Sequence, residues 1–321
     1  MSVEHEGQYK KIFTFWEPKE GMIPYLKLCL KTWERRLPQY KIIILNYSNL
    51  DNYIPPEIYD ISLLKKFTLM LQKDAVMVAV LEKHGGIFMD ADTIALRDLN
   101  PIVSRLGETE AVMFGTHCAF LAARPGSYLL KVWRKVIQDK MLRILDDGQA
   151  EKDLPWDLFS NSALDSAMNE IITSNKLVSA IQKYAVDKWA SYLREKTKKA
   201  DIEAFRGRKL LHRISNSVLI RKRNLLFRTV YKSYLIMLDR IEYGFIPEAK
   251  YFKSRFMEPQ EKYCQFWFAN KCDIKNVFTG KQSLIGLHHS WTPQWYKDFS
   301  ERDVLEHDCL LSRTLKYLLE N

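Results

Sequence analysis

The stretch that decides the fold runs from His84 to Leu96 and reads HGGIFMDADTIAL. A glycine pair that can end a helix is followed by apolar residues typical of a short buried strand, and Asp90 and Asp92 come where that strand ends. In an extended chain, residues i and i+2 point to the same side, so both carboxylates can face one ligand past the small Ala91. Such pairs favour Mg²⁺ or Mn²⁺, which leave coordination positions open for a substrate's phosphates. The stretch therefore indicates chemistry on a nucleotide diphosphate.

The residues before this stretch alternate between predicted strands and helices. Apolar runs predict buried strands, and apolar residues at helical spacing predict amphipathic helices. The resulting order of strand, helix, strand and helix is Lys11–Trp16, Ile23–Arg36, Lys41–Leu45 and Ser62–Lys83. Short connections between such elements predict a doubly wound, parallel sheet with ligands at the carboxyl ends of its strands.

The pattern after the aspartates continues and then changes. Strands are predicted at Ala111–Phe114 and Cys118–Ala122 and a helix at Ser127–Leu145, whereas the residues beyond Asp147 are mostly helical in pattern. We expect an α/β fold with a mixed, mostly parallel sheet flanked by helices and a largely helical C-terminal lobe. The predicted division is a nucleotide-binding core at 9–147, a helical lobe at 148–250, and a segment at 251–321 that returns to the site.

Composition is that of a globular protein, with 321 residues of which 47% are hydrophobic. The five cysteines are scattered, which indicates neither a disulfide framework nor a zinc site. The first residues are polar and acidic, unlike a signal peptide, and no uncharged apolar run reaches about 20 residues. We expect a cytoplasmic location.

A basic segment accounts for part of the net charge of +10. Residues 205–231 carry eight Lys and Arg side chains and no acidic one, interleaved with apolar residues. This amphipathic pattern predicts either contact with an anionic membrane surface or a solvated helix face over a core. We expect no nucleic-acid partner, because no recognised binding motif accompanies the charge.

Four motifs together resemble glycosyltransferase family 32 and its capsular-polysaccharide relatives. They are FTFW at the end of the first strand, GGIFMDAD at Gly85–Asp92, AARPG at Ala122–Gly126 and HHSW at His288–Trp291. A fifth motif of the family, S-D-x-x-R, is altered, because Lys73 stands in place of its serine and Met77 in place of its arginine. The resemblance implies a fold of the GT-A type, a UDP-sugar donor and Mn²⁺ or Mg²⁺. The core at 9–147 would then bind the nucleotide sugar, and the lobe at 148–250 would face the acceptor or a membrane. The altered motif leaves the identity of the donor sugar open.

The resemblance also implies roles for individual residues. Asp92 would ligate the metal directly, Asp90 would contact ribose and the metal or its water, and His288 or His289 would reach the metal or the diphosphate. Donor contacts would come from Trp16, Asp74, Ser290 and Trp291. Each has an ordinary alternative: core packing for Trp16, exposure beside Lys73 for Asp74, and capping or packing for the histidines.

The family is of the retaining kind, and a front-face mechanism, in which the departing phosphate takes the acceptor's proton, needs no protein nucleophile. Polar candidates for the acceptor side are Asp157, Asn161 and Asp165. The expected activity is transfer of a hexosyl or N-acetylhexosaminyl group to a lipid-linked oligosaccharide at the inner membrane face, in capsular polysaccharide or lipopolysaccharide synthesis. The alternatives are a nucleotidyl or phosphoryl transferase that uses the same aspartates and a non-catalytic adaptor at the membrane surface.

Overall fold

One sheet organises the described part of the molecule. The computed structural model describes residues 9–114, 117–148, 154–174, 232–238, 259–269, 273–274, 277–278 and 282–321. Within them, six strands form a sheet in the order β2-β1-β3-β6-β5-β7. Their bounds are β1 Lys11–Phe15, β2 Lys41–Leu45, β3 Gly86–Met89, β5 Ala111–Phe114, β6 His117–Ala123 and β7 Leu235–Leu238. Strand β6 is antiparallel to both neighbours and the other neighbouring pairs are parallel, so the predicted mixed, mostly parallel sheet is confirmed.

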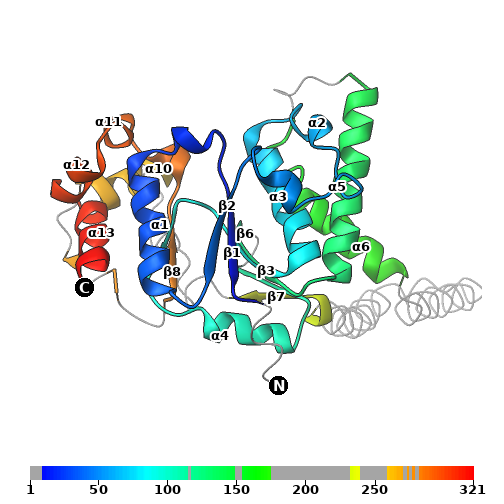
Figure 1. Ribbon diagram of the computed structural model, residues 1–321, viewed down its shortest axis with the longest axis horizontal. Coiled ribbons are helices and arrows are strands. Elements are labelled where there is room, and N and C mark those ends of the chain that lie inside the picture. The colour runs from blue at the N-terminus through cyan, green and yellow to red at the C-terminus, as the bar shows by residue number, and fades with distance from the viewer. Residues whose placement is uncertain are drawn as a thin grey trace, which may run out of the picture.

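Helices cover both faces of this sheet (Figure 1). Helix α1 lies on one side, with α12 and α13 packed against it, and α3, α5 and α6 lie on the other. The bounds of these helices are α1 Pro24–Arg36, α3 Leu69–His84, α5 Tyr128–Asp146, α6 Asn161–Ser174, α12 Glu301–Glu306 and α13 Leu310–Glu320. The shorter ones are η1 Lys19–Gly21, η2 Leu50–Asn52, α2 Ile61–Leu64, α4 Asn100–Val103, η3 Ser104–Gly107, α10 Pro259–Cys264, η5 Gln265–Ala269, η7 His289–Trp291 and α11 Gln294–Lys297.

Each face of the sheet has its own hydrophobic core. Along β1, Ile12 packs into the core under α1, whereas Phe13 and Phe15 pack into the core under α3. Because both faces of the sheet are covered, its strands are largely buried and are apolar runs without alternation, although the edge strand β2 is exposed at Lys41 and only partly buried at Ile42 and Ile44. This is the reason that short runs such as KIIIL could be predicted as strands.

The helix predicted at Ser62–Lys83 is two helices in the structure. The short α2 begins after Asp60, whose carboxylate accepts from the Ser62 N–H, and α3 begins after Thr68, whose hydroxyl accepts from the Leu71 N–H. Threonine is favoured at such a position because its oxygen satisfies an N–H that lacks a helical partner. The predicted single helix was therefore wrong, although the apolar spacing within α3 was recognised.

Strand β7 was not predicted. It lies within the span 148–250 that was assigned to a helical lobe, and it pairs in parallel with β5 of the main sheet. The predicted basic segment at 205–231 lies outside the described residues. Among the helices that are described, none has the length and apolarity needed to cross a membrane.

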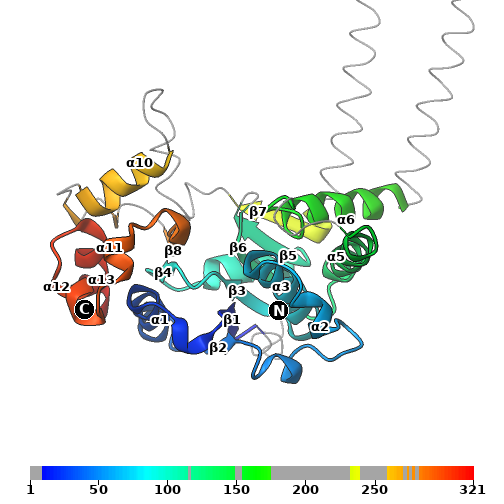
Figure 2. The same cartoon turned by 90° about the horizontal axis from the view of Figure 1, so that it is seen from above.

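A second, two-stranded sheet brings the C-terminal segment to the aspartates. Strand β4 (Thr93–Ala95) follows Asp92 directly and pairs antiparallel with β8 (Leu284–Gly286). Figure 2 shows β8, from the C-terminal part of the chain, beside β4 and next to the main sheet. The residues after β8 therefore continue past the turn that holds the aspartates.

Candidate active site

The two aspartates lie in a turn at the carboxyl end of β3. The strand ends at Met89, and the Thr93 N–H donates to the Asp90 carbonyl at 3.0 Å, which closes the turn. The extended geometry assumed for Asp90 and Asp92 is therefore absent, and their carboxylates contact different elements. Asp90 contacts α3 and Asp92 contacts the C-terminal segment.

Asp92 is hydrogen-bonded to the residues that follow β8. Its Oδ2 accepts from the His289 N–H at 2.8 Å, and its carbonyl accepts from the Leu287 N–H at 3.0 Å. Burial, and then the charge of Asp90, raise the pKa of Asp92 to about 7, while the His289 N–H acts in the opposite direction. Two carboxylates close enough to disturb each other in this way favour the approach of a cation.

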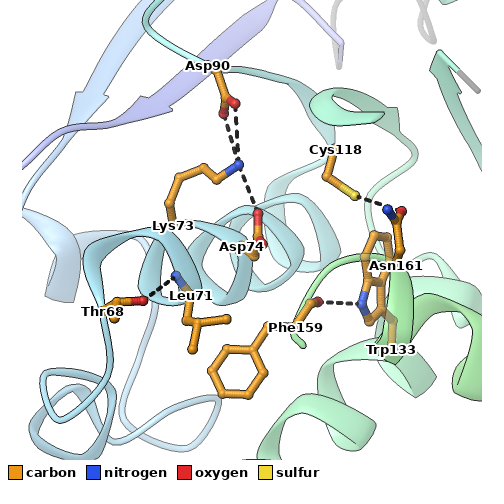
Figure 3. A network of polar contacts seen from close by, with 9 residues as sticks. All are labelled: Thr68, Leu71, Lys73, Asp74, Asp90, Cys118, Trp133, Phe159 and Asn161. Atoms are coloured by element: carbon orange, nitrogen blue, oxygen red, sulfur yellow. Dashed lines mark hydrogen bonds and ion pairs between the residues drawn. The ribbon is translucent and has the colours of Figure 1, made fainter. Parts of the chain in front are cut away.

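Lys73 contacts both Asp74 and Asp90 (Figure 3). Its Nζ lies 2.8 Å from Asp74 Oδ1 and 3.1 Å from Asp90 Oδ1. Asp74 is only 2% exposed, so the interpretation that it faces solvent is wrong. It faces Lys73 and the start of α6, where Ser160 lies close enough to lower its pKa.

The charge states of Lys73 and Asp74 follow from their surroundings. Burial disfavours the ammonium of Lys73, but the two neighbouring carboxylates outweigh that effect and raise its pKa, so the side chain stays charged. Burial raises the pKa of Asp74, and the ammonium of Lys73 opposes that rise. The role of Lys73 was missed at the sequence level, where it was noted only as a departure from a motif.

The ring of His289 is held by aromatic residues. Its Nδ1 is hydrogen-bonded to the Tyr25 hydroxyl at 2.6 Å, and the ring stacks on Tyr25 and meets Trp16 edge to face. His289 reaches Asp92 through its backbone N–H. The structure thus brings His289 to the aspartates, with one ring nitrogen already occupied by Tyr25. Tyr25, on α1, was not predicted as a site residue, and a tyrosine within an amphipathic helix gave no signal for it.

His288 lies on the other side of this segment. Its ring packs on Trp291 with centroids 4.0 Å apart and meets Tyr263 edge to face. Burial lowers the pKa of both His288 and His289 to about 4, so both rings are neutral near pH 7. A neutral imidazole can ligate a metal or form a hydrogen bond, whereas it adds no positive charge for a diphosphate.

The remaining predicted donor contacts lie on both sides of Asp92. Trp16 follows β1 and is half-buried, and its Nε1 has no hydrogen-bond partner within the described residues. Ser290 is exposed in η7, and Trp291 packs on His288 and Tyr263. Trp16 contacts His289 and Trp291 contacts His288, whereas Asp74 lies on α3 and faces Lys73.

The three acceptor candidates separate in the structure. Asn161, the first residue of α6, accepts a weak hydrogen bond from Cys118 Sγ at 3.8 Å, close to Lys73 (Figure 3). Asp165 is exposed on α6, and Asp157 lies before that helix, near Lys140. Asn161 is therefore the candidate that the structure brings nearest to the aspartates.

The residues present fit a divalent cation that binds together with a substrate. Among the described residues, no group of three or more His, Cys, Asp and Glu side chains is placed to hold a metal ion. Asp90 and Asp92 supply two carboxylates, and Mg²⁺ is often held by one or two carboxylates together with substrate phosphates. These two residues could therefore hold a cation whose remaining ligands are phosphate oxygens of the substrate.

Comparison with known proteins agrees with part of the resemblance. Residues 1–137 match the family model described as "Capsular polysaccharide synthesis protein". Among solved structures, the chain is similar to one titled "PaToxG Glycosyltransferase", with 14% identity over 57% of this chain and 80% of that chain and a TM-score of 0.35. That similarity is too low to bear on fold or function. The curated proteins contain no match.

Proposed function

We propose that this protein is a glycosyltransferase that moves a sugar from a UDP-sugar to a growing surface polysaccharide. The observation that carries the proposal is the Asp90–Asp92 turn at the carboxyl end of β3, joined by the His289 N–H to the returning C-terminal segment. The match of residues 1–137 to capsular polysaccharide synthesis proteins supports the same class of substrate. Transfer of a hexosyl or an N-acetylhexosaminyl group is compatible with the site.

Different side chains would bind different parts of the donor. Asp92 and Asp90 would hold a divalent cation, which would neutralise the charge that builds up on the departing diphosphate. Trp16 follows β1, and its indole N–H has no partner among the described residues, which suits contact with a base or sugar. Asp74 and Asn161 offer oxygens to hydroxyl groups on the α3 side. Sugar transfer with retention of the anomeric configuration by a front-face mechanism would require no protein nucleophile.

Calorimetric titration with UDP tests this proposal. We expect UDP to bind in the presence of Mn²⁺ and binding to be lost with chelator, and a panel of UDP-sugars to identify the donor by turnover. Asp92→Asn should abolish metal-dependent turnover. Asp139→Asn, an exposed aspartate on α5, is the matched control and should leave turnover unchanged. Failure of UDP to bind under either condition would reject the UDP-sugar donor.

Product analysis separates this proposal from nucleotidyl or phosphoryl transfer by the same aspartates. A glycosyltransferase releases UDP and passes on the sugar, whereas a nucleotidyl transferase releases pyrophosphate or a sugar phosphate. Release of UDP that depends on an added acceptor supports the proposal, and release of the other products would replace it.

We further propose that the protein acts on a lipid-linked acceptor at the cytoplasmic face of the membrane. The support is the basic, amphipathic composition of residues 205–231. Pelleting with vesicles that contain anionic lipid should weaken when Arg221, Lys222 and Arg223 are changed to glutamate. Unchanged pelleting would remove the membrane contact and leave the transferase proposal intact.

A further inference from the structure

Lys73 is a cation buried among the acidic groups of the candidate site. Its side chain is 18% exposed, and its Nζ lies within 3.4 Å of both Asp90 carboxylate oxygens and 2.8 Å from Asp74 Oδ1. Figure 3 shows the ammonium between the two carboxylates, with Asp90 above it and Asp74 below it. Asp90 is therefore already paired with a cation of the protein, which it shares with Asp74.

A divalent cation at Asp90 would need the same oxygens. A metal ion at Asp90 would therefore have to displace Lys73, since its Nζ contacts both oxygens of that carboxylate. Asp92 does not compensate, since one of its oxygens accepts from the His289 N–H. The free protein thus presents a poor site for a metal ion, although it carries the two aspartates.

We propose that Lys73 is a positioning residue that withholds Asp90 from divalent cations until a nucleotide diphosphate binds. This inference rests on the proposed function. The phosphates bring negative charge that can take the ammonium away from Asp90, while the contact with Asp74 keeps the lysine in place. Asp90 is then released to the cation that accompanies the phosphates. Metal and nucleotide consequently bind in a strongly coupled way.

Titration of the free protein with Mn²⁺, and then with Mn²⁺ in the presence of UDP, tests this role. An ammonium beside a carboxylate lowers the pKa of that carboxylate by about 1–3. Removal of the charge of Lys73 should likewise raise the affinity of Asp90 for a cation. Lys73→Met should therefore bind Mn²⁺ about tenfold or more tightly without UDP than the wild type does. The factor by which UDP increases Mn²⁺ affinity should fall in the same variant.

Matched variants show whether the charge of Lys73 or its packing causes a change in Mn²⁺ affinity. Lys83→Met makes the same change on the exposed end of α3 and should bind Mn²⁺ like the wild type. Lys73→Arg keeps the charge and should also do so. Where Lys73→Met does not fold, as judged by circular dichroism, Lys73→Gln keeps a hydrogen-bond donor for Asp74 and gives the same test.

The outcomes are distinct. Unchanged Mn²⁺ affinity in the folded neutral variants would overturn the role of Lys73, and so would an equal increase in Lys83→Met. Absence of UDP binding by the wild type under all conditions would instead reject the UDP-sugar donor. The titration of the free protein with Mn²⁺ would still decide whether Lys73 withholds Asp90.

Discussion

The His289 N–H donates to Asp92 Oδ2 at 2.8 Å, although the two residues are 197 positions apart in the chain. This hydrogen bond joins the turn after β3 to the segment after β8, beside the β4–β8 pairing. The aspartate proposed as the direct metal ligand thus also helps to hold the segment after β8 on the core.

Two substitutions of Asp92 should separate these roles. Asn keeps an oxygen that can accept from His289, so Asp92→Asn should unfold within about 1 kcal/mol of the wild type while losing metal-dependent turnover. Asp92→Ala also removes the acceptor and should cost about 1–3 kcal/mol. Urea unfolding followed by fluorescence measures both. Equal stability of the two variants would show that the hydrogen bond contributes nothing.

Gly85 is required where α3 turns into β3. It has φ of +60°, and a Cβ there would lie 2.5 Å from Pro125 Cδ and 2.6 Å from the Pro125 nitrogen. Gly85→Ala should cost about 2–5 kcal/mol, the sum of backbone strain and overpacking. Gly126 has a similar φ of +71° and nothing near its missing Cβ, so Gly126→Ala should cost only about 1–2 kcal/mol. Unfolding in urea compares them, and an equal loss would exclude the contact with Pro125 as a cause.

The sheet was predictable from sequence where both of its faces are covered. Strands β1, β2, β3 and β5 are short apolar runs between turn signals, and each was expected close to its observed bounds. Strand β7 is an equally apolar run, LIML, but it lies far along the chain from its neighbour β5. Local patterns cannot show which distant run completes a sheet, so its place was not predicted.

Residues of the candidate site were recognised from the sequence, whereas the contacts between them were not. Asp90 and Asp92 were recognised from their local spacing, and HHSW from its concentration of polar and aromatic residues. The contacts between them depend on β4–β8 pairing, which local spacing does not reveal. Lys73 lies beside Asp74 in the sequence, yet only the packing of α3 under the turn shows that its ammonium also reaches Asp90.

His84 should contribute to a loss of stability in mild acid, as should His288 and His289, whose pKa values burial also lowers. His84 ends α3, its Nε2 lies 2.9 Å from the Tyr53 carbonyl, and burial lowers its pKa below the usual 6.5. The unfolded chain therefore binds more protons below pH 6.5, so the contribution of His84 is present above that pH and is lost as the pH falls toward its folded pKa.

His84→Gln keeps a donor for the Tyr53 carbonyl but does not titrate. Its urea midpoint should fall less than that of the wild type between about pH 7.5 and pH 5.5. Parallel curves for the two proteins over this range would show that His84 is not the group responsible.

The pair of Lys73 and Asp74 should be strongly coupled in stability. Lys73→Met leaves the carboxylate of Asp74, which is 2% exposed, without its cation, and loss of one partner of a buried ion pair costs about 3–5 kcal/mol. Asp74→Asn should cost less, because Lys73 keeps Asp90 as a partner. In the double variant no charge is left at either position, so much of the loss should be recovered, which a double-mutant cycle of unfolding free energies measures.

A loss below about 1 kcal/mol for Lys73→Met would mean that Asp74 takes up a proton when the lysine is removed, since burial already raises its pKa. The pH dependence of that variant would then show the uptake directly, because the protein without Lys73 would lose stability as the pH rises through the new pKa of Asp74.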